Sequence, residues 1–408
     1  MFKNKTIVTI FCTVFIDLLG IGILIPVIPQ LFANPGSEFF LLPYGVSVKT
    51  GYLLLGFLLA IYPIGQFLAT PILGQLSDKY GRKKILALSL LGTAVSYAVF
   101  AYAIVTKNIP LLFGARFLDG ITGGNISVAQ AMIADISTPE NRAKNFGMLG
   151  AAFGLGFIFG PYLGGRLSDP LTVSWFTAAT PFYFAGILAF LNMLSVLFVL
   201  KETNKHMHDE PMNLTKSLSN IGRAIKMKGV NIIFLTNFFF FGGFTFFTSF
   251  FAVYLINKFN FTQGQIGDFF AYVGLWSVFT QGVVTRYVAK KFSQEKVVRV
   301  TLLASGLLVL AYFLPQHPWE ILLIPPFFSL ASGLTMANLG ALLSRSAPRH
   351  LQGEILGINA SVQALAQSIP AILSGFIAAS LAPTTPIIVA SIVIIVGALL
   401  FNRLYKTA

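Results

Sequence analysis

Long apolar runs alternate with short polar segments along the whole chain. Each run has about 20 residues, the length with which an α-helix crosses the hydrocarbon core of a bilayer. The short segments of alternating hydrophobicity that build a membrane β-barrel do not occur. The pattern therefore predicts an all-α polytopic membrane protein with twelve transmembrane helices, at residues 6–32, 49–73, 85–105, 109–135, 145–168, 176–200, 229–257, 264–285, 297–314, 319–343, 352–380 and 384–402.

One longer polar segment, 201–228, divides the runs into two groups of six. Two groups of equal number are typical of a duplicated membrane fold. Segments 137–147 and 346–357 support a repeat, because each places a proline, polar residues and then a glycine after the fourth run of its group. We therefore expect two six-helix pseudo-repeats, 1–200 and 229–408, joined by a cytoplasmic linker at 201–228.

Composition agrees with a membrane protein and excludes other classes. The chain is 55% hydrophobic and 10% charged, whereas a soluble domain carries about 25% charged residues. The net charge of +14 does not indicate nucleic acid, because the basic residues lie between the apolar runs and form no soluble module. The single cysteine, Cys12, lies inside a run and excludes an internal disulfide.

The basic residues also predict the orientation. With the N-terminus inside, 23 Lys and Arg residues fall in cytoplasmic segments and four in outer segments. The run at 6–32 is too long for the apolar core of a signal peptide, so we expect it to remain as the first span. The prediction is a multi-pass protein of the cell (inner) membrane with both termini cytoplasmic.

Three charged residues lie deep inside predicted spans, away from the span ends: Asp17 in the first and Arg116 and Asp119 in the fourth. A charge in hydrocarbon is costly unless it is neutralised, paired or in contact with water, so such residues are functional candidates. Arg116 and Asp119 are three residues apart and share one face of a helix. Two readings stay open: these residues couple transport to protons, with Arg116 tuning Asp17 or Asp119, or they form structural contacts.

The fifth run contains Pro161 and six glycines, which are Gly150, Gly154, Gly156, Gly160, Gly164 and Gly165. Small residues along a membrane helix let another helix approach closely, and proline bends the helix. The pattern by itself predicts tight packing of this helix against a neighbouring helix.

The candidates for a substrate cavity are polar and aromatic residues inside spans: Asn125, Gln130, Asn237, Phe241, Trp276 and Gln281. Each has a structural alternative, since amides bond across to other helices and phenylalanines pack against lipid. Asp268 either guards the outer gate or sits among lipid headgroups.

We expect no cofactor, no metal and no enzymatic activity. His206 and His208 with Asp209 and Glu210 lack a further convergent ligand in the linker. The glycines of the fifth run do not follow a strand, which excludes a dinucleotide loop, and the sequence has no Walker motif for ATP.

The segment 74–84, between the second and third runs, is predicted as a short polar loop. It holds Asp78, Lys79, Arg82, Lys83 and Lys84, with Gly74 and Gly81 at the ends of its polar part. This loop and the stretches 17–29, 116–124 and 150–165 resemble, in order, motifs of the major facilitator superfamily. Within it the chain is most similar to twelve-span drug:proton antiporters close to tetracycline exporters.

The resemblance implies a proton-coupled secondary transporter that works as a monomer on a small-molecule substrate. It also implies that the fifth run makes a hinge-and-seal contact between the two halves, as an alternative to simple tight packing. For the loop, the topology leaves two readings open, a gate and a topology anchor only. As a gate, Asp78 would meet the N-terminal end of a helix in the other half or Arg142, and Arg82 would pair with an acid across the same seam, Asp135. The chain departs from those exporters at Ser96 and Ser305, where they carry acids, and near Trp276, where they carry a histidine. These departures put tetracycline itself and that proton path in question.

The function predicted from the sequence is export of a small amphipathic compound or drug in exchange for protons. Two alternatives stay open: a proton-coupled importer of a metabolite or siderophore-type chelate, and a non-transporting membrane sensor on the same fold.

Overall fold

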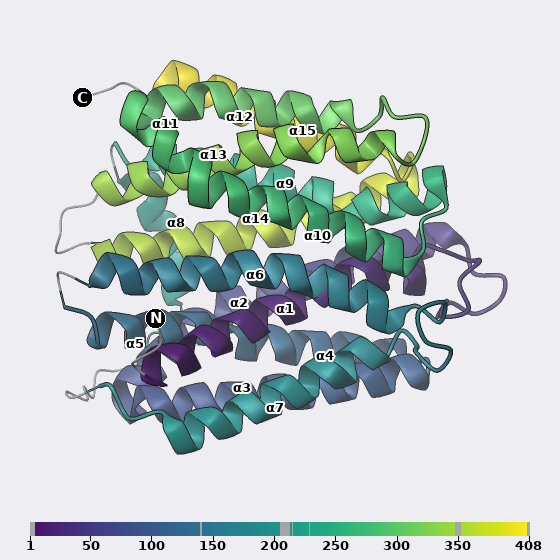
Figure 1. Cartoon of the computed structure of the whole chain (residues 1–408), viewed down its shortest axis with the longest axis horizontal. Coiled ribbons are helices and arrows are strands. Elements are labelled where there is room, and N and C mark those ends of the chain that lie inside the picture. The colour runs from purple at the N-terminus through teal and green to yellow at the C-terminus, as the bar shows by residue number, and fades with distance from the viewer. Residues whose placement is uncertain are drawn as a thin grey trace.

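The structure is a computed structural model that describes residues 5–138, 141–204, 213, 215–227, 229–346 and 352–405, with backbone only at 142–144, 216–217 and 352–354. The described helices run side by side in one bundle (Figure 1). Their bounds are α1 (Lys5–Phe32), α2 (Val48–Tyr80), α3 (Arg82–Val105), α4 (Ile109–Thr122), α5 (Ile126–Asp135), α6 (Arg142–Ser168), α7 (Thr180–Val199), α8 (Lys216–Lys226), α9 (Asn231–Phe259), α10 (Gln263–Phe279), α11 (Thr285–Lys291), α12 (Gln294–Ala311), α13 (Pro325–Arg345), α14 (Gln352–Ser380) and α15 (Thr385–Leu404).

These helices make the twelve predicted crossings of the bundle, with α8 outside them. Two crossings are interrupted: a 3₁₀ segment (Gly123–Asn125) joins α4 to α5, and a π-helical segment (Thr280–Val284) joins α10 to α11. Nine helical segments of the described chain are long and apolar enough to cross a membrane. Helix α1 begins and α15 ends at the same end of the bundle (Figure 1), here called the terminus side; the opposite end is the far side.

The prediction of a polar loop at 74–84 is wrong, because every residue of this segment except Gly81 is helical. Helix α2 continues to Tyr80 and α3 begins at Arg82, so only Gly81 separates them. Polar side chains do not end a helix when they reach solvent and the backbone hydrogen bonds continue. Gly81 has φ 94°, a conformation that glycine adopts without steric cost.

Glycine contacts bring helix backbones together both within and between the halves. In the N-terminal half (α1–α7), Gly22 of α1 lies against Gly160 of α6. Between the halves, α2 packs on α14 and α6 packs on α10. At Gly56, Gly165, Gly267 and Gly375 an added Cβ would lie 2.4–2.8 Å from a backbone oxygen of the opposing half.

The hinge-and-seal prediction placed the glycines of α6 at the contact between the halves. Only some of them lie there. Gly156, Gly160 and Gly164 face α1 in the same half, whereas Gly165 faces α10 across the seam. Residues four apart share a helix face, so 156, 160 and 164 form one stripe. Gly154 meets only the side chain of Val278, at 2.9 Å from an added Cβ, and the backbone oxygen of Pro161 lies against Gly267 of α10.

Gly160→Leu and Gly154→Leu form a matched pair in α6. We expect Gly160→Leu to lower the melting temperature of the detergent-solubilised protein, because its side chain must displace the backbone of α1, at a cost of about 1–3 kcal/mol or more. Gly154→Leu should change it little, since the Val278 side chain can rotate. Thermal unfolding followed by circular dichroism measures both; equal melting temperatures would contradict this packing.

Candidate functional site

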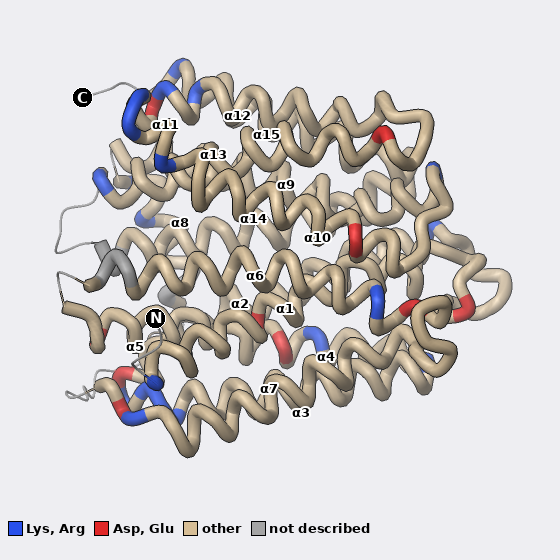
Figure 2. Tube along the Cα trace, viewed as in Figure 1, with Lys and Arg blue, Asp and Glu red and all other residues tan. Residues whose placement is uncertain are grey.

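Most charged residues lie toward the two ends of the bundle, but a compact group lies midway, on α1 and α4 (Figure 2). This group is Asp17, Arg116 and Asp119, whose residues are 3–4% exposed. The sequence placed all three inside spans, and the structure places Asp17 close enough to Asp119 for their charges to interact. We call these three residues the acid cluster.

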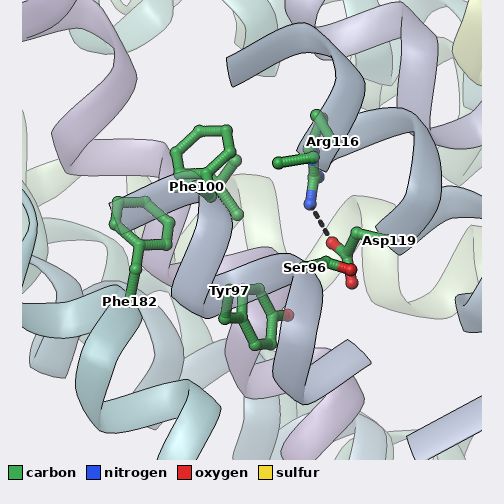
Figure 3. A pocket seen from close by; sticks show the side chains of 8 residues that line it. Ser96, Tyr97, Phe100, Arg116, Asp119 and Phe182 are labelled. Carbon is green, nitrogen blue, oxygen red and sulfur yellow. Dashed lines mark hydrogen bonds and ion pairs between the residues drawn. The ribbon is translucent and has the colours of Figure 1, made fainter. Parts of the chain in front are cut away.

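Arg116 and Asp119 form a short buried ion pair. Arg116 Nη1 donates to Asp119 Oδ2 at 2.6 Å (Figure 3). The guanidinium also lies over the ring of Tyr62 from α2, 4.2 Å from the ring centroid. Pairing and stacking offset part of the cost of burying two charges. Sequence reasoning found the pair from its spacing but missed Tyr62, which α2 supplies from 54 residues away.

Asp17 has no ion-pair partner within the part of the chain that the structure describes, and its Oδ2 has no hydrogen-bond partner there. Asn125 lies beside it and interacts with its carboxyl group. Asn125 is fully buried, and its amide atoms also lack a well-formed hydrogen bond. The cluster thus holds an ion pair, Arg116–Asp119, next to a second acid, Asp17, that has no counter-charge among the described residues.

Two aromatic residues that the sequence did not single out enclose this group. Tyr97 of α3 reaches α1 because residue 20 is glycine: an added Cβ there would lie 1.7 Å from the phenolic oxygen. Tyr97 and Phe100 line a gap beside the ion pair, too narrow to hold a water molecule (Figure 3). Ser96 lines the same gap and donates to the backbone oxygen of Gly92 at 2.8 Å.

The other predicted cavity residues do not join the acid cluster through any contact among the described residues. Asn237 is buried and donates to Asn359 of α14 at 2.9 Å. Phe241 packs on the core of the C-terminal half (α9–α15). Trp276 contacts the rings of Tyr272 and Phe279, and Gln130 and Gln281 are exposed. Of the six candidates, Asn125 alone is placed beside Asp17.

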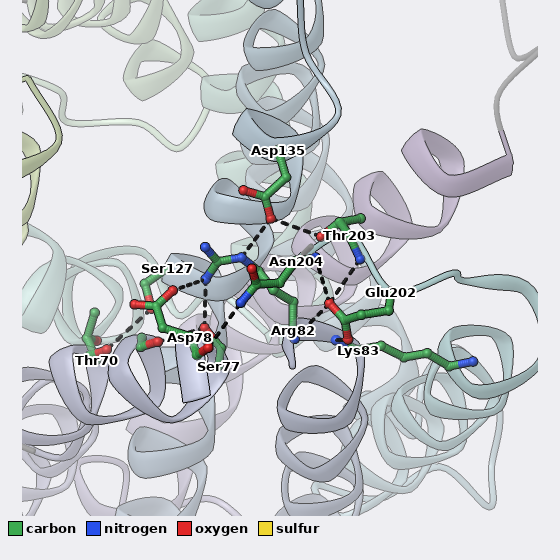
Figure 4. A network of polar contacts seen from close by, with 11 residues as sticks. Thr70, Ser77, Asp78, Arg82, Lys83, Ser127, Asp135, Glu202, Thr203 and Asn204 are labelled. Atoms are coloured by element: carbon green, nitrogen blue, oxygen red, sulfur yellow. Dashed lines mark hydrogen bonds and ion pairs between the residues drawn. The ribbon is translucent and has the colours of Figure 1, made fainter. Parts of the chain in front are cut away.

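A polar network on the terminus side joins α2, α3 and α5 (Figure 4). Arg82 pairs with Asp135 at 2.8 Å, as predicted, and also with Asp78 at 2.8 Å. Glu202, which the sequence analysis missed, accepts hydrogen bonds from the backbone amides of Arg82 and Lys83, both at 3.1 Å. A carboxylate at the first amides of a helix satisfies donors that have no partner within the helix.

Among the residues that the structure describes, no hydrogen bond or ion pair given for Asp78, Arg82 or Asp135 reaches the other half, so the predicted partners of Asp78 are not found there. Asp78 pairs with Arg82 of its own segment, and the side chain of Arg142 lies outside the described residues. An added Cβ at Gly74 would meet nothing within 4 Å. The same holds for five other glycines near the terminus side: Gly147, Gly150, Gly282, Gly340 and Gly357.

On the far side, polar contacts join the two halves directly. Arg166 of α6 donates to both carboxylate oxygens of Asp268 of α10, at 2.6 and 3.1 Å. Asp169 Oδ2 accepts from the backbone amide of Gly264, near the start of α10, at 3.1 Å. Asp268 is therefore part of a seam contact. We call Arg166, Asp169 and Asp268 the far-side contacts; their residues line a surface hollow of about 200 Å³.

Two six-helix halves, joined at one end and carrying buried charges midway, are the architecture of a membrane transporter. The family model described as Major Facilitator Superfamily matches residues 10–371, and the chain belongs to this family. It is thus a multi-pass membrane transporter rather than an enzyme, and the resemblance predicted from its motifs is confirmed.

The relatives agree with this placement. The chain is 32% identical over 395 residues to the tetracycline resistance protein, class H, of Pasteurella multocida, covering 92% of this chain and 89% of the relative. It is 27% identical to multidrug resistance protein 2 of Bacillus subtilis, covering 97% and 94%. The crystal structure of a D-xylose-proton symporter has the same fold, with a TM-score of 0.78, 17% identity, and 98% and 99% of the two chains covered.

Variants of Arg116 and Asp119 test how their pairing contributes to the stability of the protein. Asp119→Asn leaves the buried Arg116 charge without its counter-charge, so we expect a loss of about 3–5 kcal/mol in the free energy of unfolding. The double variant Arg116→Gln with Asp119→Asn removes both charges and should recover most of that loss. Thermal unfolding measures both; a double variant no more stable than Asp119→Asn would contradict a neutralising role.

Proposed function

We propose that this protein exports a small amphipathic compound in exchange for protons, by alternating access between its two halves. The observation that carries the proposal is Asp17: a buried carboxyl within a span, unpaired, beside an amide whose hydrogen bonds are unfilled. A structural acid would have its partners in place, whereas an acid that exchanges protons must tolerate both of its charge states. The names of the relatives support export of drugs, and they do not favour the importer or the sensor.

The two acids of the cluster take different roles in this proposal. Asp119 is held by Arg116, so the pair contributes no net charge. Protonation of Asp17 then takes the cluster from a net charge of −1 to zero. The neutral cluster is stable in a dry, closed site, and the ionised cluster is stable when water reaches it. Tyr62 and Asn125 would hold Arg116 and Asp17 in position during this change.

The distribution of Lys and Arg supports an orientation in the membrane, and the contacts between the two halves support a conformational state. The excess of Lys and Arg supports an orientation in the cell (inner) membrane in which the terminus side faces the cytoplasm. Because the halves make their close glycine contacts and their direct ion pair on the far side, we propose that the structure is the inward-facing state. In the outward-facing state the far-side contacts would break, and the network around Arg82 would dock on the other half. The protein would work as a monomer.

Asp17→Asn tests the coupling. We expect proteoliposomes with this variant to lose substrate accumulation driven by an imposed pH gradient, while exchange of labelled for unlabelled substrate persists, because Asn cannot release a proton. Tetracycline and a cationic dye serve as probes. Cys12→Ser, also in α1, is the matched control and should behave as the unchanged protein. Gradient-driven uptake by Asp17→Asn at the unchanged rate would contradict the assignment.

Asp169→Ala combined with Arg166→Gln tests the assignment of state. We expect this variant to populate a form open on the far side, because both polar links across the seam are lost. Spin labels on cysteines at the exposed positions Trp175 and Trp319, in a Cys12→Ser background, report the distance by electron–electron resonance. The distance distribution should shift to longer values. Lys107→Gln removes an exposed far-side charge between α3 and α4, away from the seam, and should not shift it; equal distributions in all three proteins would contradict the proposal.

A further inference from the structure

Helix α8, in the linker between the halves, has one face packed on the bundle and one that is not. On the packed face, Asn220 and Ala224 are 6% and 4% exposed, and Asn220 Nδ2 donates to Ser361 Oγ of α14 at 3.3 Å. On the other face, Leu218 and Ile225 are 64% and 71% exposed. These two residues are seven apart and lie on the same face of the helix. An exposed apolar face on a helix outside the spans needs a partner.

The exposed apolar edge of α8 is bordered by positive charge. Arg223 and Lys226 are exposed next to it, and the helix contains no acidic residue. A helix with an apolar face beside a basic, polar face is typical of segments that lie in the plane of the membrane interface. Basic residues next to a bilayer favour anionic headgroups. The charge and the apolar edge therefore fit one partner, the surface of an anionic membrane.

The position of α8 places this face at the edge of the bundle. It lies at the terminus side (Figure 1) and packs on α14 and α9, with further contacts to α2. Just before it, Asn213 exchanges two hydrogen bonds with the side chain of Gln75 in α2, at 2.7 and 3.2 Å. This segment therefore contacts both halves: the N-terminal half through α2 and the C-terminal half through α14 and α9.

We propose that the exposed face of α8 binds anionic phospholipid headgroups of the cytoplasmic leaflet. Leu218 and Ile225 would enter the boundary between headgroups and acyl chains, and Arg223 and Lys226 would contact the phosphates. The proposal concerns binding alone, so it holds or fails independently of the exported compound and of the role of Asp17.

A fluorescent label beside the apolar edge tests this directly. Gly222→Cys, in a Cys12→Ser background, places a bimane between Leu218 and Ile225, where an added side chain meets nothing within 4 Å. The protein is reconstituted with brominated phosphatidylglycerol or brominated phosphatidylcholine at the same mole fraction. We expect quenching by both lipids, with half-maximal quenching at a mole fraction on the order of 10-fold lower for the anionic lipid.

Two charge variants and one apolar variant sharpen the test. Arg223→Gln with Lys226→Gln should abolish the preference for the anionic lipid. Lys290→Gln with Lys291→Gln removes the same charge from the exposed end of α11 and should preserve it. Ile225→Ser should reduce quenching by both lipids. Equal quenching by the two lipids in the unchanged helix would overturn the proposal, as would no quenching by either, the result expected if residues 205–212 or a second copy covered this face.

Discussion

The ion pair between Arg116 and Asp119 determines how the middle of this protein is built. A guanidinium in hydrocarbon needs a counter-charge and a flat surface, and it has both in Asp119 at 2.6 Å and the ring of Tyr62. The ring fits because residues 120 and 123 are glycines: an added Cβ would lie 2.4 Å from the Tyr62 carbonyl oxygen at the first and 2.3 Å from its phenolic oxygen at the second. The segment 116–124 thus contains both Arg116 and the two glycines that make room for Tyr62.

The buried pair and the far-side pair differ in what they contribute. The side chains of Arg116 and Asp119 are both 5% exposed, and breaking a buried pair costs several kcal/mol. Those of Arg166 and Asp268 are 44% and 41% exposed, and exposed pairs contribute about 0–1 kcal/mol. In the proposed transport cycle the far-side pair opens each time, and a contact that opens repeatedly has to be weak. The structure therefore places its strong pair within one half and its weak pair between the halves.

The sequence was sufficient for features that depend on local spacing. The length of the apolar runs predicts twelve crossings, and the spacing of three residues predicts the Arg116–Asp119 pair. The pairing of Arg82 with Asp135 followed from the predicted topology, which places both residues at the same ends of their spans. Features that depend on how helices are rotated against one another were missed. Three glycines of α6 face α1 rather than α10, and only the packing decides this.

Partners from distant segments were also beyond sequence reasoning. Glu202 binds the start of α3 from 120 residues away, and nothing in its own segment marks it for that role. Asp169 follows its span as an ordinary polar residue, yet it binds the first turn of a helix in the other half. The end of α2 was predicted too early because the onset of polarity was taken as the end of the helix.

The single residue between α2 and α3 has a mechanical consequence. A flexible loop absorbs displacement, whereas a one-residue joint has only the two dihedral angles of Gly81 to do so. Glu202 also fixes the first amides of α3 to the end of α7. A force applied to the terminus-side end of α2 is therefore transmitted to α3 and α7 with little loss. At this end, α2, α3 and α7 are therefore joined with little freedom to shift relative to one another.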